Sequence, residues 1–131
     1  MFSKKNLYFL TVSLKNTGDF KETYKSIEKK LLKLFKVKII AYELGSKGVH
    51  LHMHAIIRPT KSKHKIMLKD YLNSKFRIPL DQRKKAVYVV EIPDPDRERY
   101  YVGYILKEQE GSDIPSSYSE NYIKHSLEYY K

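Results

Sequence analysis

The chain has 131 residues, a net charge of +11 and no cysteine. This length suits one domain with a single core, and the absence of cysteine excludes disulfides and thiolate metal sites, so we expect a cytoplasmic protein. No apolar run approaches the ~20 residues of a membrane span, and the N-terminus lacks the pattern of a signal peptide, so we expect no membrane partner.

Side-chain patterning predicts the elements in chain order. Aromatic and β-branched residues predict strands over residues 7–14, 37–44, 49–58 and 86–92. Apolar residues at spacings of three and four predict helices over 20–35, 66–76 and 96–109, with Asp19 and Asp96 as N-caps, and a short helical pattern over 120–129. A hairpin turn is expected at 45–48, a basic loop at 60–65 and a polar loop at 79–85.

The predicted order of elements is β-α-β-β-α-β-α. The hairpin joins the central strands, which makes the sheet largely antiparallel with helices packed on it. We therefore expect an α+β fold of ferredoxin-like or RRM-like architecture, with one domain over 1–131 and a peripheral tail from about residue 112. In such a sheet one face is buried under helices and the other is free for chemistry.

Three histidines alternate along the strand 49–58, at His50, His52 and His54. Alternate residues of a strand share a face, so the imidazoles are spaced by about 7 Å on the face opposite an apolar one. Imidazole with the carboxylate of Glu43 on the preceding strand suits Mn²⁺ or Mg²⁺. The outer two histidines are too far apart to bind one ion equally. The ligand pair is therefore His50 with His52, which the short hairpin would bring near Glu43, or His52 with His54.

Positive charge is concentrated after this strand. Residues 58–85 carry ten Lys or Arg against two Asp or Glu, whereas residues 86–131 carry five against nine. A basic field beside a metal site indicates a polyanion, and nucleic acid is the partner we expect. The candidate contacts are Arg58, Lys61, Lys63 and Lys65; the alternative is a solubilising surface.

The helix 96–109 carries a second group of candidate residues. Tyr100, Tyr104 and Lys107 share one face at spacings of four and three. A phenol has a pKa near 10, so it needs a neighbouring cation or a metal that polarises its target to act as a nucleophile. Gly103 lies within this helix at a cost of roughly 0.8–1 kcal/mol relative to alanine, which indicates a close approach there.

Together these residues resemble the HUH endonucleases. The strand reading Phe9-Leu10-Thr11, the His-hydrophobic-His strand and the helix with Tyr104-x-x-Lys107 resemble the three motifs of that family in order, over about residues 7–111. The closest likeness is to the rolling-circle replication initiators of small viruses and plasmids. The chain differs from them in offering three histidines, and it lacks the Gly-x-x-x-x-Gly-Lys-Ser/Thr motif of a helicase domain.

The resemblance implies a specific chemistry. Such enzymes bind Mn²⁺ or Mg²⁺ through two histidines and often a third polar ligand, here Glu43, and a tyrosine attacks the phosphate of single-stranded DNA. The products are a 5′-phosphotyrosine link and a free 3′-OH, and the reaction reverses to join strands. Tyr104 is the expected nucleophile, because only this tyrosine has lysine at +3, and Lys107 is expected to assist it.

Two other functions fit the same residues. A tyrosine transposase or relaxase of a mobile element would use the same chemistry. A non-catalytic single-stranded nucleic-acid binding module would explain the charge and the 12 tyrosines, but not the histidines in register. The protein would act in the host cytoplasm if it is viral, and an oligomer is compatible with the sequence.

Overall fold

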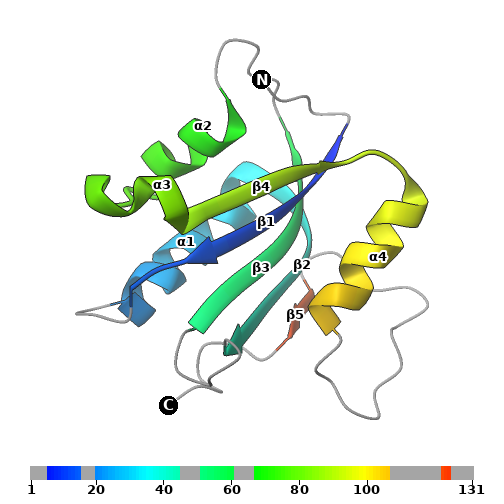
Figure 1. Cartoon of the computed structure of the whole chain (residues 1–131), viewed down its shortest axis with the longest axis horizontal. Coiled ribbons are helices and arrows are strands. Elements are labelled where there is room, and N and C mark those ends of the chain that lie inside the picture. The colour runs from blue at the N-terminus through cyan, green and yellow to red at the C-terminus, as the bar shows by residue number, and fades with distance from the viewer. Residues whose placement is uncertain (1–5, 16–19, 45–50, 61–66, 107–121, 125–131) are drawn as a thin grey trace.

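The computed structural model describes residues 6–15, 20–44, 51–60, 67–106 and 122–124 (Figure 1). In chain order the elements are β1 (Leu7–Ser13), α1 (Phe20–Leu34), β2 (Phe35–Leu44), β3 (Leu51–Pro59), α2 (Leu68–Lys75), a 3₁₀ turn η1 (Leu80–Gln82), α3 (Arg83–Ala86), β4 (Val87–Ile92), α4 (Pro95–Leu106) and β5 (Tyr122–Lys124). The described part of the chain contains no helix that is both long and apolar enough to span a membrane.

The strands form one sheet in the order β4-β1-β3-β2-β5. β1 lies antiparallel between β3 and β4, β2 pairs antiparallel with β3, and only β5 runs parallel to its neighbour. The α+β class and the largely antiparallel sheet are thus confirmed. Across the central strands, Thr11 pairs with His54 and His54 pairs with Ala41, so this row crosses the middle of the sheet.

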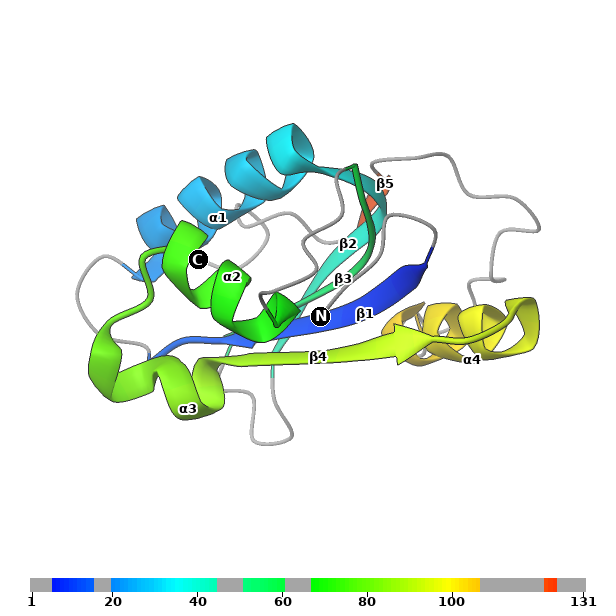
Figure 2. The same ribbon diagram turned by 90° about the horizontal axis from the view of Figure 1, so that it is seen from above.

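One face of the sheet is covered by α1 and α2 (Figure 2). The expected apolar stripe of α1 is buried, with Tyr24, Ile27 and Leu31 fully enclosed. The Tyr24 hydroxyl accepts a hydrogen bond from the Leu14 amide and donates to the carbonyls of Val12 and Leu51. Burial raises the pKa of Tyr24 to about 12, although the bond from Leu14 opposes the shift. This phenol belongs to the core.

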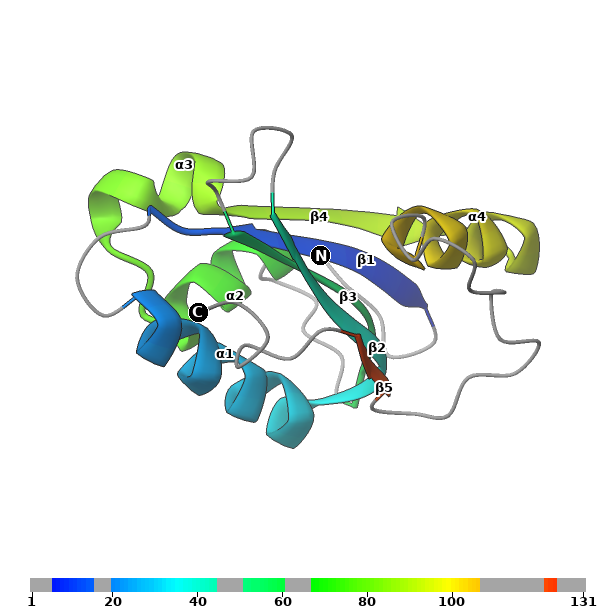
Figure 3. The ribbon, with the colours of Figure 1, turned by 90° about the horizontal axis from the view of Figure 1, so that it is seen from below.

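The opposite face packs against α4 (Figure 3). Val102 and Ile105 of α4 are buried there with Phe9, Ile39 and Ile56. The alternation expected for 49–58 is confirmed in β3, because Leu51, Met53, Ala55 and Ile57 enter the core under α1 while Ile56 packs under α4. A second, smaller core therefore fixes α4 on the histidine face.

Three expectations about local structure are wrong. Residues 80–85 are not a loop but helical turns, because the Gln82 amide bonds to the Pro79 carbonyl and the Arg83 side chain bonds to the Ile78 carbonyl. The described part of 120–129 is strand β5, since the free edge of β2 offers backbone partners that a short helical pattern does not outweigh. The cap of α4 is Asp94, whose Oδ1 accepts the Arg97 amide, with Pro95 at the first helical position. Asp96 is therefore inside the helix, and Asp19 lies outside the described residues.

Candidate active site

His54 lies at the centre of the histidine face, between two neighbouring strands. Its Nδ1 is 2.8 Å from the Thr11 hydroxyl on β1, and its Nε2 is 2.5 Å from Glu43 Oε1 on β2. Thr11 is directly opposite His54 in the sheet, whereas Glu43 reaches it diagonally from the position opposite His52. Both ring nitrogens are therefore engaged, so the orientation of the ring is fixed from two sides.

The Glu43–His54 pair is withdrawn from water. The side chains of His54 and Glu43 are only 6% and 12% exposed. A carboxylate accepts hydrogen bonds and does not donate them, so His54 presents an Nε2–H to Glu43 in this arrangement. The Thr11 hydroxyl can donate or accept, and it therefore supports the ring in either tautomer.

His52 completes the acidic and imidazole cluster. Its ring centroid is 6.5 Å from that of His54, on the same face of β3. We call Glu43, His52 and His54 the histidine cluster. The third candidate, His50, lies outside the described residues.

The donor types of the histidine cluster match those that bind Mn²⁺ or Mg²⁺-like ions. Two atoms that share one ion at about 2.1 Å each are themselves about 3 Å apart, and the 2.5 Å between Glu43 and His54 is instead that of a hydrogen bond. Accordingly, no three His, Cys, Asp or Glu side chains within the described ranges form a ready metal group. The cluster fits a divalent ion in chemistry, and Glu43 and His54 must separate to hold one.

Tyr104 lies against this cluster from the last turns of α4. Its ring meets the His54 ring edge-on, with centroids 5.8 Å apart and an interplanar angle of 81°. The residue is 38% exposed, so Tyr104 is in contact with the cluster and also accessible from solvent. Helix and strand thus bring together the two candidate motifs, which are 50 residues apart in sequence.

Phe9 of β1 contacts both rings of this pair. It stacks on His54 at 5.6 Å and on Tyr101 at 4.6 Å, and it meets Tyr104 edge-on at 6.0 Å. Tyr100, in contrast, is 57% exposed and lies under the guanidinium of Arg97, 5.3 Å from its ring centroid. Of the two tyrosines four residues apart, Tyr104 is therefore the one in ring contact with His54.

Several contributors were not among the expected site residues. Thr11 and Phe9 belong to the first motif, but their roles depend on the pairing of β1 with β3, which no local pattern specifies. Tyr88 of β4 is 60% exposed and is opposite Thr11, in the row that contains His54. Its alternation with Val87 and Val89 was the only signal for it.

The remaining candidates are divided between described and undescribed residues. Arg58 is at the far end of β3 on the histidine face, half-buried. Lys107, Lys61, Lys63 and Lys65 lie outside the described residues.

Comparison of the chain with models of known protein families, with characterised proteins and with solved structures finds no match to any of them.

Proposed function

We propose that this protein is a metal-dependent, sequence-specific endonuclease that nicks and joins single-stranded DNA through a covalent 5′-phosphotyrosine intermediate. The observation that supports it most is the contact of Tyr104 with His54, whose other neighbours are Thr11 and Glu43. A half-exposed phenol beside a buried imidazole–carboxylate pair is the combination that the likeness to HUH endonucleases requires.

The proposed reaction is a transesterification. Tyr104 Oη forms a bond to the scissile phosphorus while the bond from phosphorus to the 3′ oxygen breaks, and the phenolic proton is lost as the 3′ oxygen gains one. Attack by a 3′-OH on the phosphotyrosine reverses these steps and joins strands, so no nucleotide cofactor is consumed. Lys107, three residues after Tyr104 in the sequence, would favour the phenolate by its positive charge.

The histidine cluster would hold the metal. When bound, Mn²⁺ or Mg²⁺ supplies a Lewis acid that polarises the phosphate. The ligands would be Glu43, His52 and His54, with His50 as the alternative to His54. Thr11 would then accept the Nδ1–H of His54 and hold its Nε2 toward the cluster.

The strand would lie across the face that carries α4. Tyr88 offers an exposed aromatic ring in the row of Thr11 and His54, and aromatic rings bind single strands by stacking on bases. Lys61, Lys63 and Lys65 of the expected basic loop would hold the phosphates, because the described part of the chain that follows, from α2 to α3, packs on the other face of the sheet.

The biological role that follows is initiation of rolling-circle-type replication of a virus or plasmid, in the cytoplasm of its host. A transposase or relaxase would use the same site. A non-catalytic binding module for single-stranded nucleic acid is the alternative from another class of function. The exposed Tyr88 and the basic segment fit this alternative as well as they fit a nuclease.

A covalent-adduct assay separates these classes. The protein is incubated with Mn²⁺ and labelled single-stranded oligonucleotides of degenerate sequence, and adducts are resolved on a denaturing gel. We expect an adduct for the parent and for Tyr100→Phe, and none for Tyr104→Phe, which should still bind DNA. Binding without an adduct in the parent would favour the binding module.

A further inference from the structure

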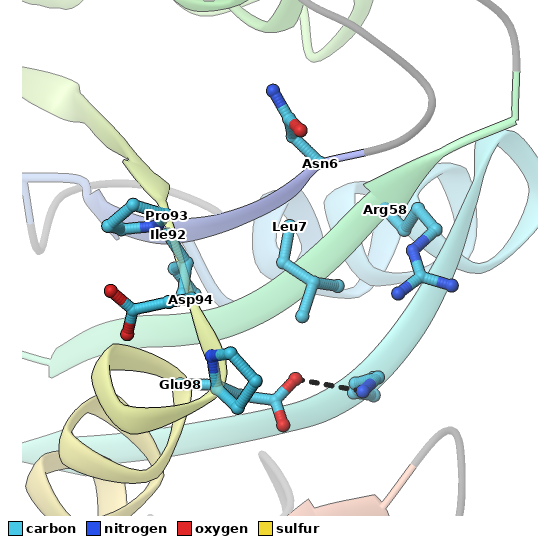
Figure 4. Close-up of a pocket in the computed structure, with 9 residues that line it drawn as sticks. Asn6, Leu7, Arg58, Ile92, Pro93, Asp94 and Glu98 are labelled. Atoms are coloured by element: carbon cyan, nitrogen blue, oxygen red, sulfur yellow. Dashed lines mark hydrogen bonds and ion pairs between the residues drawn. The ribbon is translucent and has the colours of Figure 1, made fainter.

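A second feature of the histidine face is a pocket of about 370 Å³ at the opposite end of α4 from Tyr104 (Figure 4). It is formed where β1, β2, β3, the end of β4 and the start of α4 meet. The lining residues used below are Leu7, Lys38, Arg58, Ile92 and Glu98.

Within the part of the chain that the structure describes, Arg58 is the cation of this pocket without a counter-ion. Its Nε is buried and has no hydrogen-bond partner among the described residues, and no carboxylate of that part of the chain forms an ion pair with it. Lys38, in contrast, is 2.8 Å from Glu98, a pair that ties β2 to α4. A planar, partly buried guanidinium without an acceptor is suited to a ligand that supplies acceptors side by side.

Glu98 gives the pocket an acceptor in addition to this donor. Arg58 and Glu98 both line the pocket, while the carboxylate of Asp94 points away from them (Figure 4). Only one of the lone-pair sites of Glu98 is used by Lys38. A phosphate would meet repulsion from this carboxylate, whereas a flat ligand with both acceptors and donors on its edge would satisfy both groups.

We propose that this pocket binds a guanine base of the DNA strand and so contributes to the choice of nicking sequence. Guanine presents the acceptors O6 and N7, for which arginine is the commonest specific partner. The neighbouring N1–H and N2–H₂ donors suit Glu98, and Leu7 and Ile92 provide apolar surface for the ring. Unpaired bases of single strands are read in this way on their edges. This inference rests on the proposed function, because it assumes that the strand crosses this face.

The position fits a base near the scissile phosphate. Arg58 is four residues beyond His54 on the same face of β3, about 13 Å along the strand. Glu98 and Tyr104 are six residues apart on α4, about 9 Å along the helix. The guanine would therefore lie within a few nucleotides of the nick.

The test measures binding without cleavage. Fluorescence anisotropy is recorded for protein in EDTA with a labelled thymidine dodecamer and with the same oligomer carrying one central guanosine. We expect the guanosine to raise affinity about tenfold. Replacing it by 7-deazaguanosine, which lacks the N7 acceptor, or by inosine, which lacks N2, should remove most of this gain.

Variants assign the effect to Arg58. Arg58→Lys keeps the charge but not the planar fork, so it should bind the thymidine oligomer like the parent and lose the guanosine preference. Arg58→Gln should lose the preference as well, and Arg77→Gln, an exposed arginine after α2, should keep it. Equal loss of affinity for both oligomers in Arg58→Gln would indicate a phosphate contact and overturn the proposal, as would a parent that does not distinguish guanosine from 7-deazaguanosine.

The pocket and the nuclease can fail separately. A parent that prefers guanosine but forms no adduct with Mn²⁺ would contradict the proposed function and keep the pocket. Titration with guanosine 5′-monophosphate, followed by the NMR methyl signals of Leu7 and Ile92, gives a readout independent of strand binding. If those signals do not move and no oligomer preference is found, the pocket is refuted even where the adduct forms.

Discussion

The two faces of the sheet use tyrosine in opposite ways. On the face covered by α1, Tyr24 of that helix is fully buried and its hydroxyl bonds to three backbone groups. On the other face, Tyr104 is 38% exposed and touches the ring of His54. The same residue type is thus part of the core on one face of the sheet and part of the candidate active site on the other.

The difference follows from what surrounds each phenol. Burial disfavours the phenolate of Tyr24, which raises its pKa to about 12 and makes it inert. Tyr104 is 38% exposed and lies next to His54, whose ring nitrogens contact Thr11 and Glu43. A tyrosine count alone, 12 in this chain, therefore says little until each phenol is assigned to a face.

The largest effect should come from removing the imidazoles of the histidine cluster. His52→Ala and His54→Ala should each abolish the Mn²⁺-dependent adduct, because two of the proposed metal ligands lie there. The measurement is adduct yield over time, with Mn²⁺ affinity from titration calorimetry.

His125→Ala is the control, since it removes a histidine outside the strand. If His52→Ala forms adduct at the parental rate with the same metal requirement, the assignment of the cluster is wrong.

Alkaline pH should weaken the core face selectively. The pKa of Tyr24 in the folded protein, about 12, exceeds the ordinary value of 10, so its contribution to stability is complete below pH 10 and is lost as the pH rises through 12. Two pH units correspond to about 3 kcal/mol. Urea unfolding of the parent and of Tyr24→Phe from pH 8 to 12 should show the parent's advantage shrinking above pH 10. A gap that stays constant would mean that Tyr24 does not titrate differently in the two states.

Thr11 should matter less than the histidines. Thr11→Val keeps the shape but removes the hydroxyl that holds His54 Nδ1, and loss of such a supporting bond typically costs about 10- to 100-fold in activity or metal affinity. Adduct rates at saturating and at limiting Mn²⁺ would separate a loss of activity from a loss of metal affinity. Thr60→Val, at the far end of β3, should match the parent. If Thr11→Val forms the adduct like the parent, the Thr11 hydroxyl is not needed to orient His54, and Glu43 alone would hold the ring.

The smallest expected effect contrasts the two phenols directly. Tyr104→Phe should change the free energy of unfolding by less than about 0.5 kcal/mol, because it keeps the ring that meets His54 and Phe9 and removes only the hydroxyl of an exposed residue. Tyr24→Phe leaves the Leu14 amide without its acceptor and should cost about 1–3 kcal/mol at pH 8. Chemical denaturation of both variants checks this, and a large loss in Tyr104→Phe would make it a structural residue.

Local pattern was enough for much of the fold. The alternation of β3 and the stripe of α1 are periodicities of single elements, and both are confirmed by burial. Local pattern did not predict three short features: the helical turns within 79–85, the strand at 122–124 and the cap at Asp94. Short segments take their conformation from the neighbours that they contact.

The candidate site was accessible only in part for the same reason. The sequence spacing predicted that Glu43 lies near the histidines. In the sheet Glu43 is opposite His52, but its carboxylate bonds to His54. This diagonal contact depends on the strand register and on the side-chain rotamer. The Thr11–His54 bond joins residues 43 apart in sequence. The pocket at Arg58 needs five elements to meet, and no single segment of the sequence predicts it.

Locating the adduct tests the central claim most directly. The parent is incubated with Mn²⁺ and degenerate single-stranded oligonucleotides, digested with nuclease and trypsin, and the modified peptide is fragmented in a mass spectrometer. Because trypsin leaves Tyr100, Tyr101 and Tyr104 on one peptide, the fragment ions decide between them. We predict a nucleotide phosphate on Tyr104 alone. A nucleotide on Tyr100 or Tyr101, or no modified peptide from a protein that binds the DNA, would contradict the account.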